Sequence, residues 1–221
     1  MNINVILMTA LVSATASAQE KAVPVEEEPH HKTVLKNDFV QVFRVNLAPG
    51  QSSLMHTHSH DDAAVRLSKA TVTADSPGKP TGAPEFVTPG LVSARECEKH
   101  PHTHRVNNIG STLFDVIDVQ ILKRPDGPPA PATTPPAAEN PRMRVYRYEL
   151  EPGAGSAQHT HERPYLIVAA TDMDLGMTAP GGASRAHPIK AGEFHWVESK
   201  VTHTLVNDGK EKGVIVEFEL K

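Results

Sequence analysis

Alternation of apolar and polar residues is the dominant regular pattern of the chain. Residues 214–220 place four apolar side chains on one face of a strand and two glutamates on the other: Val214, Val216, Phe218 and Leu220 against Glu217 and Glu219. Residues 117–121 repeat this pattern, with Ile117, Val119 and Ile121 on the predicted buried face and Asp118 and Gln120 outward. A period of two is typical of strands, and no stretch keeps a helical apolar period for three turns. The pattern predicts an all-β protein.

Two copies of one unit follow each other along the chain. Residues 40–58 align without gaps with residues 143–161, and nine of the nineteen positions are identical. In both copies a Pro-Gly turn is followed by five residues and then by His-Thr-His. A second match, residues 104–110 with 203–209, occurs in the same order. The sequence therefore predicts a tandem duplication in which each unit is an antiparallel sandwich or barrel.

The segment between the copies, residues 124–141, contains seven prolines. Such a segment favours extended polyproline geometry and is predicted to be a linker. The predicted units then cover residues 38–123 and 142–221.

The first residues resemble a secretory signal. An apolar run at residues 5–12 precedes Ala16-Ser17-Ala18, a small-x-small pattern that signal peptidase recognises. The run is shorter than the ~20 residues of a membrane-spanning helix. We expect residues 1–18 to be a signal peptide and the mature protein to be secreted or periplasmic.

Composition excludes several classes of function. The net charge of −4 offers no basic patch for phosphates, so we expect no nucleic-acid partner. The single cysteine, Cys97, allows neither a disulfide within the chain nor a cysteine-rich zinc site. The expected partner is a small molecule, with a homo-oligomer left open.

Histidines are unusually frequent, 13 among 221 residues, and they recur in register. The rings of a His-x-His pair on one strand share a face and can hold one metal ion. A third histidine from a remote strand completes each set: His56, His58 and His104 in the first unit, and His159, His161 and His203 in the second. Imidazole suits iron, copper, nickel or zinc. His60, His100 and His102 crowd the first set and leave its ligand assignment more open.

This spacing resembles the cupin superfamily. Its first motif is Gly, five residues, His-x-His, three or four residues, Glu. Its second motif contains a later Gly and then His, three residues, Asn. Gly153, His159 and His161 match the first motif in the second unit, and Gly192, His203 and Asn207 match the second motif. In the first unit the matches are Gly50, His56, His58, Asp62, His104 and Asn108. The resemblance implies two tandem double-stranded β-helix (jelly-roll) barrels and a divalent transition metal: Fe, Mn, Ni, Cu or Zn.

The two units depart from the family motif in different ways. The family glutamate is replaced by Asp62 in the first unit, which we expect to bind the metal, and by Tyr165 in the second. The second site is therefore expected to be a set of three histidines without a carboxylate. Because an anionic ligand strengthens the binding of a divalent cation, this assignment predicts that the first unit binds metal more tightly.

Two classes of function remain open, because a fold does not fix a function. The first is a metal-dependent enzyme acting on a small molecule, such as a dioxygenase or an isomerase. The alternative is a non-catalytic protein that binds a metal or a small molecule on the same scaffold. The sequence identifies no general base, so the catalytic residues remain unassigned.

Overall fold

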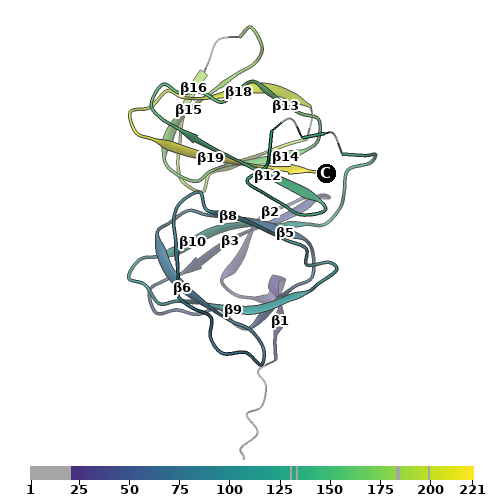
Figure 1. The fold of residues 1–221 in the computed structure, drawn as a ribbon, viewed down its shortest axis with the longest axis vertical. Coiled ribbons are helices and arrows are strands. Elements are labelled where there is room, and N and C mark those ends of the chain that lie inside the picture. Colours follow the sequence, from purple (N-terminus) through teal and green to yellow (C-terminus); the bar gives the residue numbers. More distant parts are fainter. Residues whose placement is uncertain (1–20, 130, 133, 183–184, 199) are drawn as a thin grey trace, which may run out of the picture.

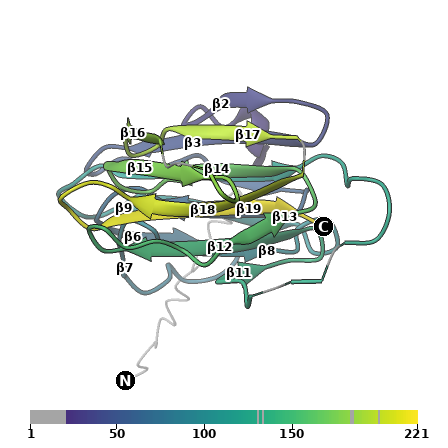
Figure 2. The ribbon, with the colours of Figure 1, turned by 90° about the horizontal axis from the view of Figure 1, so that it is seen from above.

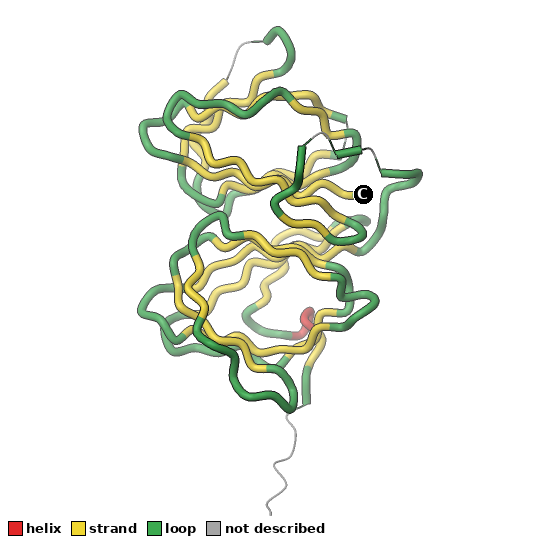
Figure 3. Tube along the Cα trace, in the orientation of Figure 1, coloured by secondary structure: helices red, strands yellow, loops and turns green. Residues whose placement is uncertain are grey.

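Two β-barrels follow each other along the long axis of the molecule (Figure 1). The computed structural model describes residues 21–129, 131–132, 134–182, 185–198 and 200–221. The predicted signal peptide, residues 1–18, lies outside the described residues, and export stays a prediction. Apart from one short 3-10 helix, η1 (Val25–Glu27), the described elements are strands (Figure 3). None of the described helical structure has the length and apolar character of a membrane span.

The first barrel consists of two five-stranded sheets, in the orders β1-β4-β9-β6-β7 and β2-β3-β10-β5-β8. Its strands are β1 (Val23–Pro24), β2 (His31–Lys36), β3 (Val40–Leu47), β4 (His56–His58), β5 (Asp62–Arg66), β6 (Ala70–Asp75), β7 (Glu85–Val87), β8 (Val92–Arg95), β9 (His102–Asn108) and β10 (Phe114–Ile121). β1 pairs in parallel with β4, and the other pairings in this barrel are antiparallel.

The second barrel repeats this plan with sheets in the orders β11-β12-β19-β14-β17 and β13-β18-β15-β16. Its strands are β11 (Ala138–Glu139), β12 (Met143–Leu150), β13 (His159–His161), β14 (Tyr165–Ala169), β15 (Met173–Thr178), β16 (Arg185–Ile189), β17 (Phe194–Val197), β18 (Val201–Asn207) and β19 (Gly213–Leu220). The registers agree between the barrels: His56 pairs with His104, and His159 with His203. The all-β prediction and the tandem jelly-roll prediction are confirmed.

Strands also lie outside the expected unit boundaries. β1 and β2 precede residue 38, and they pair with β4 and β3 of the first barrel. β11 lies within the segment 124–141, where a linker was expected, and pairs with β12.

The apolar faces of β10 and β19 lie between the barrels. Ile117, Val119 and Ile121 of β10 belong to one buried cluster with Val214, Val216, Phe218 and Leu220 of β19. Viewed from above, the strands of both barrels run across the long axis, so that one sheet lies over the other (Figure 2). Each barrel has a second cluster of its own in its interior.

The opposite faces of these two strands point into the barrels. This corrects the expectation that four polar side chains point outward, because all of them are buried: Asp118, Gln120, Glu217 and Glu219. The two central strands are buried on both faces, since one face meets the other barrel and the second face lines a barrel interior. The alternation correctly predicts strands, but the expectation that its polar face meets solvent is wrong, because that face is buried.

Two aligned arginines cross the interface between the barrels. Arg147 of the second barrel donates from Nε to the carbonyl of Gly90 in the first, at 2.8 Å. Arg44 of the first barrel lies where a Cβ on Gly192 would meet its guanidinium at 2.9 Å. The glycine before each second His motif therefore leaves room for the other barrel.

Candidate metal centres

Four side chains converge inside the second barrel. His159 and His161 come from β13, His203 from β18 and Glu217 from β19, and one ligand atom of each lies within 4.8 Å of the others. The ring Nε2 atoms of His159, His161 and His203 lie 3.1, 3.0 and 3.2 Å from the Glu217 carboxylate. The structure thus adds a buried carboxylate to the three histidines, which corrects the expectation of a site without one.

Hydrogen bonds at the far sides of the rings fix their orientation. His161 Nδ1 lies 2.7 Å from Glu219 Oε2, and His159 Nδ1 lies 2.9 Å from the Ala157 carbonyl. Since both partners only accept, Nδ1 carries the proton and Nε2 is directed toward Glu217. Metal-binding histidines commonly donate their other ring N–H to a carboxylate in this way.

Two buried polar atoms of this cluster have no hydrogen-bond partner among the described residues, which bears on whether a metal ion fits here. His203 Nε2 and Glu217 Oε1 are buried and, among the described residues, make no hydrogen bond, although only 3.2 Å separates them. Orphaned polar atoms in a protein interior are rare and costly. Three neutral imidazoles and a carboxylate form a donor set that a divalent transition metal accepts. The residues therefore fit a metal ion.

Electrostatics hold the cluster together without a metal. Burial alone would raise the pKa of Glu217, but the three histidines lower it well below its usual range. Burial alone would lower the pKa of His161, but Glu217 and Glu219 raise it to about 9. A metal ion would replace this proton as the positive partner of Glu217.

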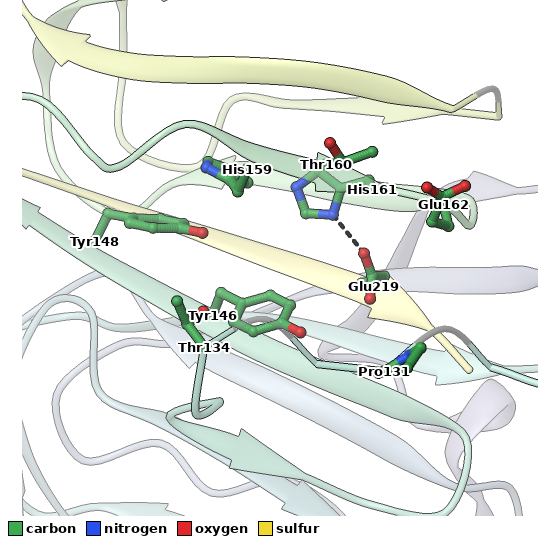
Figure 4. A pocket seen from close by; sticks show the side chains of 9 residues that line it. All are labelled: Pro131, Thr134, Tyr146, Tyr148, His159, Thr160, His161, Glu162 and Glu219. Atoms are coloured by element: carbon green, nitrogen blue, oxygen red, sulfur yellow. Dashed lines mark hydrogen bonds and ion pairs between the residues drawn. The ribbon is translucent and has the colours of Figure 1, made fainter.

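A pocket of about 290 Å³ opens beside His159 and His161 (Figure 4). Other lining residues are Tyr146, Tyr148, Thr160 and Glu219. The Tyr148 ring stacks on His159 with ring centroids 5.2 Å apart. Burial, together with nearby glutamates, raises the pKa of both tyrosines, so each hydroxyl stays protonated and can donate. Small-molecule sites combine such walls with a few polar groups.

Tyr165 occupies the family glutamate position without acting as a ligand of this cluster. It is fully buried and stacks on His161, with ring centroids 3.9 Å apart. The carboxylate comes instead from Glu217, 56 residues beyond His161. A signal for it exists in the sequence, because Asp118 and Glu217 occupy the same place in the last strand of each unit, with register partners Ala64 and Ile167.

The first barrel brings together all three of its predicted histidines. The ring centroid of His56 lies 5.1 Å from that of His58 and 4.6 Å from that of His104. His58 Nε2 and His104 Nε2 face each other at 3.3 Å, and His56 Nε2 is buried without a partner among the described residues. Burial lowers the pKa of His56 to about 3 and that of His58 to about 4. These rings are neutral, the form that binds metals.

Asp62 is held by other side chains. Arg95 Nε and Nη2 donate to its two carboxylate oxygens at 2.8 and 2.9 Å, and His58 Nδ1 lies 2.9 Å from Oδ2. Because His58 contacts Asp62 through Nδ1, the carboxylate orients this ring as Glu219 orients His161. Asp62 also forms a group with His58 and Asp118 whose ligand atoms all lie within 4.8 Å of one another. Its expected role as a metal ligand therefore stays a prediction, beside its role in positioning His58.

His31 also belongs to this site, although no sequence pattern pointed to it. His31, His56 and His58 can each direct a ligand atom to one point, and His31 Nδ1 lies 2.6 Å from Glu28. His31 comes from β2, outside the aligned repeat, so no internal match identifies it. His102 also approaches, with its ring centroid 4.5 Å from that of His104.

The asparagine of the second family motif has a structural role. In both barrels it donates to two backbone carbonyls and accepts from a glycine N–H, as Asn108 does with Leu47, Thr112 and Gly110. Asn207 repeats the pattern in the second barrel. Trp196 packs at the interface between the barrels and stacks on Phe39, at 6.1 Å.

Comparison with known proteins agrees with this fold. A β-alanine degradation protein, BauB of Pseudomonas aeruginosa, is 31% identical over 83 residues, which make up 38% of this chain and 86% of the relative. AerE of Microcystis aeruginosa superposes with a TM-score of 0.56 at 11% identity, covering 88% of this chain and 98% of that protein. No protein-family model matches the chain.

A second solved structure is a two-barrel enzyme. Oxalate decarboxylase of Bacillus subtilis, described with Mn(II) centres, superposes with a TM-score of 0.50 at 13% identity, covering 93% of this chain and 78% of the enzyme. The chain belongs to the cupin superfamily, and its two barrels make it a bicupin. Its histidine and glutamate clusters are compatible with metal binding.

Proposed function

We propose that this protein is a metal-dependent enzyme acting on a small organic molecule, with its reaction centre in the second barrel. The observation that carries the proposal is the quartet of His159, His161, His203 and Glu217, whose unpartnered buried atoms lie behind an open pocket. A divalent metal ion held there would act as a Lewis acid with coordination positions left for a substrate. The proposed reaction is a dioxygenase-like oxidation or an isomerisation of this small molecule.

The side chains of the pocket define what the protein itself contributes. Tyr146 and Tyr148 present neutral hydroxyls that can donate hydrogen bonds to substrate oxygens. Glu219 accepts from Nδ1 of His161 and so holds the ring with its Nε2 toward Glu217. The stacked ring of Tyr148 limits the motion of His159. The similarity to a protein named for β-alanine degradation supports a role in the metabolism of small molecules.

Metal titration followed by calorimetry tests the centre. The wild-type protein is expected to bind Mn²⁺ or Fe²⁺, and the Glu217→Gln variant to lose at least about 10-fold in affinity at the second-barrel site, because a direct anionic ligand is removed. The matched control is Glu162→Gln, which changes an acid at the pocket rim that pairs with Lys200. If Glu217→Gln bound the metal ion as tightly as the wild type does, the proposed metal centre in the second barrel would be wrong.

A measurement of substrate turnover distinguishes the proposed enzyme from a non-catalytic binding protein. Iron-loaded protein is expected to consume O2 with a cognate small organic substrate, and His159→Ala/His161→Ala to abolish this uptake. Tight metal binding with no turnover of any kind across a broad substrate panel would favour the non-catalytic binding protein.

A further inference from the structure

The interior of the first barrel holds an arginine without a carboxylate partner. Arg66 of β5 is half-buried, and its Nη1 donates to Ser93 Oγ at 2.6 Å. Its Nε is buried and has no hydrogen-bond partner, and no carboxylate of the described residues lies within ion-pair distance of it. Burial lowers the pKa of Arg66, as expected for a cation removed from water. Guanidinium groups remain charged even so.

Other arginines on this sheet show what such a group binds. Arg95 donates hydrogen bonds from Nε and Nη2 to the two carboxylate oxygens of Asp62. Arg44 donates from the same two atoms to the carboxylate oxygens of Asp115, at 3.1 and 2.7 Å. This paired geometry is the one in which guanidinium and carboxylate fit best. In Arg66 the Nε, one of the two donors used in this geometry, has no acceptor among the described residues.

Space for a ligand adjoins Arg66. It lines a chamber of about 200 Å³ together with Val72, Val87 and Glu85. It also lines an inner chamber of about 70 Å³ that reaches His58 and Asp118. Arg95, His104, Val106 and Phe114 border both spaces. These volumes lie below the usual range of drug-sized ligand sites, so they suit a molecule of a few carbon atoms.

The acids near Arg66 act on its charge only from beyond ion-pair distance, Glu85 most strongly and Asp118 and Asp62 more weakly. Asp62 already forms an ion pair with Arg95 and a hydrogen bond with His58. Asp118 lies 3.7 Å from each of the same two side chains. Glu85 belongs to the exposed edge strand β7. A largely buried charge without a direct ion-pair partner is unfavourable, and a bound anion would reduce that cost.

The second barrel lacks these cations. In its equivalent register positions, Ala169 stands where the first barrel has Arg66, and Val197 where it has Arg95. The aliphatic and aromatic walls of the chambers add contacts for carbon, which an inorganic anion would leave unused. The two barrels therefore differ in the charge that they offer to a ligand.

We propose that the first barrel binds a small organic carboxylate, with its carboxylate group on Arg66 and its carbon skeleton against Val106 and Phe114. This site is independent of the metal centre proposed in the second barrel. It assigns the two barrels different ligands.

Calorimetry with the full-length protein tests the site, using acetate, propionate and succinate, with propionamide as the uncharged analogue of propionate and sulfate as an inorganic anion. At least one carboxylate is expected to bind, and Arg66→Gln to weaken it by about 10-fold or more, because a charge-assisted hydrogen bond is lost. Propionamide and sulfate are expected to bind more weakly than the best carboxylate. Arg124→Gln, at an exposed arginine bonded to the Pro141 carbonyl, is the control and should not change affinity.

Thermal unfolding keeps the test independent of misfolding. Without ligand, Arg66→Gln should unfold at the same or a higher temperature than the wild type, since it removes an unpaired charge. Added carboxylate should stabilise the wild type and not this variant. Absence of carboxylate binding, equal binding of propionamide or sulfate, unchanged affinity in Arg66→Gln, or a destabilised ligand-free Arg66→Gln would each overturn the proposal. Loss of the second-barrel metal centre would not.

Discussion

Cys97 illustrates how a single side chain is governed by its surroundings. It is 1% exposed, and its Sγ lies 3.8 Å from Asp62 Oδ2, beside the Asp62–Arg95 ion pair. Burial raises the pKa of Cys97 to about 12, and the charge of Asp62 adds to this effect. Since the thiolate is the reactive form, this cysteine is a packed side chain rather than a nucleophile.

Alkylation kinetics check this expectation. At pH 8 we expect iodoacetamide to modify Cys97 at least roughly 1000-fold more slowly in the folded protein than in guanidinium chloride, since three pKa units separate the thiols. As the pH rises, the rate for the folded protein should keep increasing toward pH 12, whereas the rate for the unfolded chain levels off above its ordinary thiol pKa. Mass spectrometry of timed samples measures both rates. Folded and unfolded rates within 10-fold of each other would contradict the assignment.

At the scale of elements, β10 and β19 carry both the interface and the sites. Each strand has eight buried residues in succession, with a largely apolar face toward the other barrel and Asp118 or Glu217 toward its own interior. Asp118 of β10 and Glu217 of β19 are equivalent in register, yet their surroundings differ. Burial and the nearby Asp62 raise the pKa of Asp118 to about 8, whereas Glu217 remains ionised among its histidines.

This difference reverses the expected order of metal affinity. The second barrel should bind a divalent ion more tightly, because Glu217 is an available anion and Asp62 is neutralised by Arg95. Titration of Zn²⁺ into His56→Ala/His58→Ala and into His159→Ala/His161→Ala isolates each site in turn. The first variant is expected to keep the tighter site, by about 10-fold or more. Equal affinities, or tighter binding in the second variant, would restore the assignment based on Asp62.

At the scale of the whole molecule, the interface between the barrels is the largest shared feature. Apolar side chains of β3, β5 and β10 pack against those of β12, β14 and β19, and each barrel sends an arginine to a glycine of the other. An apolar interface of this kind resembles a domain core, so we expect the two barrels to unfold together. Gly90 is central to it, since its φ is +81° and an added Cβ would lie 2.6 Å from Val214 Cγ1.

Two glycine substitutions separate local strain from interface packing. Gly50→Ala, at φ +78° with no atom within 4 Å of an added Cβ, should cost about 1–2 kcal/mol through backbone strain alone. Gly90→Ala combines the same strain with the collision across the interface and should cost roughly 2–5 kcal/mol. Urea unfolding gives both free energies. Equal losses would show that the second barrel does not constrain Gly90.

The sequence by itself determined the duplication, the strands and the six histidines, since these depend on local periodicity and on motifs repeated in register. A period of two shows which side chains share a face, but it does not show what each face meets. Only the tertiary structure decided that Glu217 contacts His159, although 58 residues separate them in the chain. It likewise decided that Arg95 forms an ion pair with Asp62, which lies 33 residues earlier. Those contacts arise when the sheets close into barrels and the barrels pack together, because a strand buried on both faces leaves its acids no access to solvent.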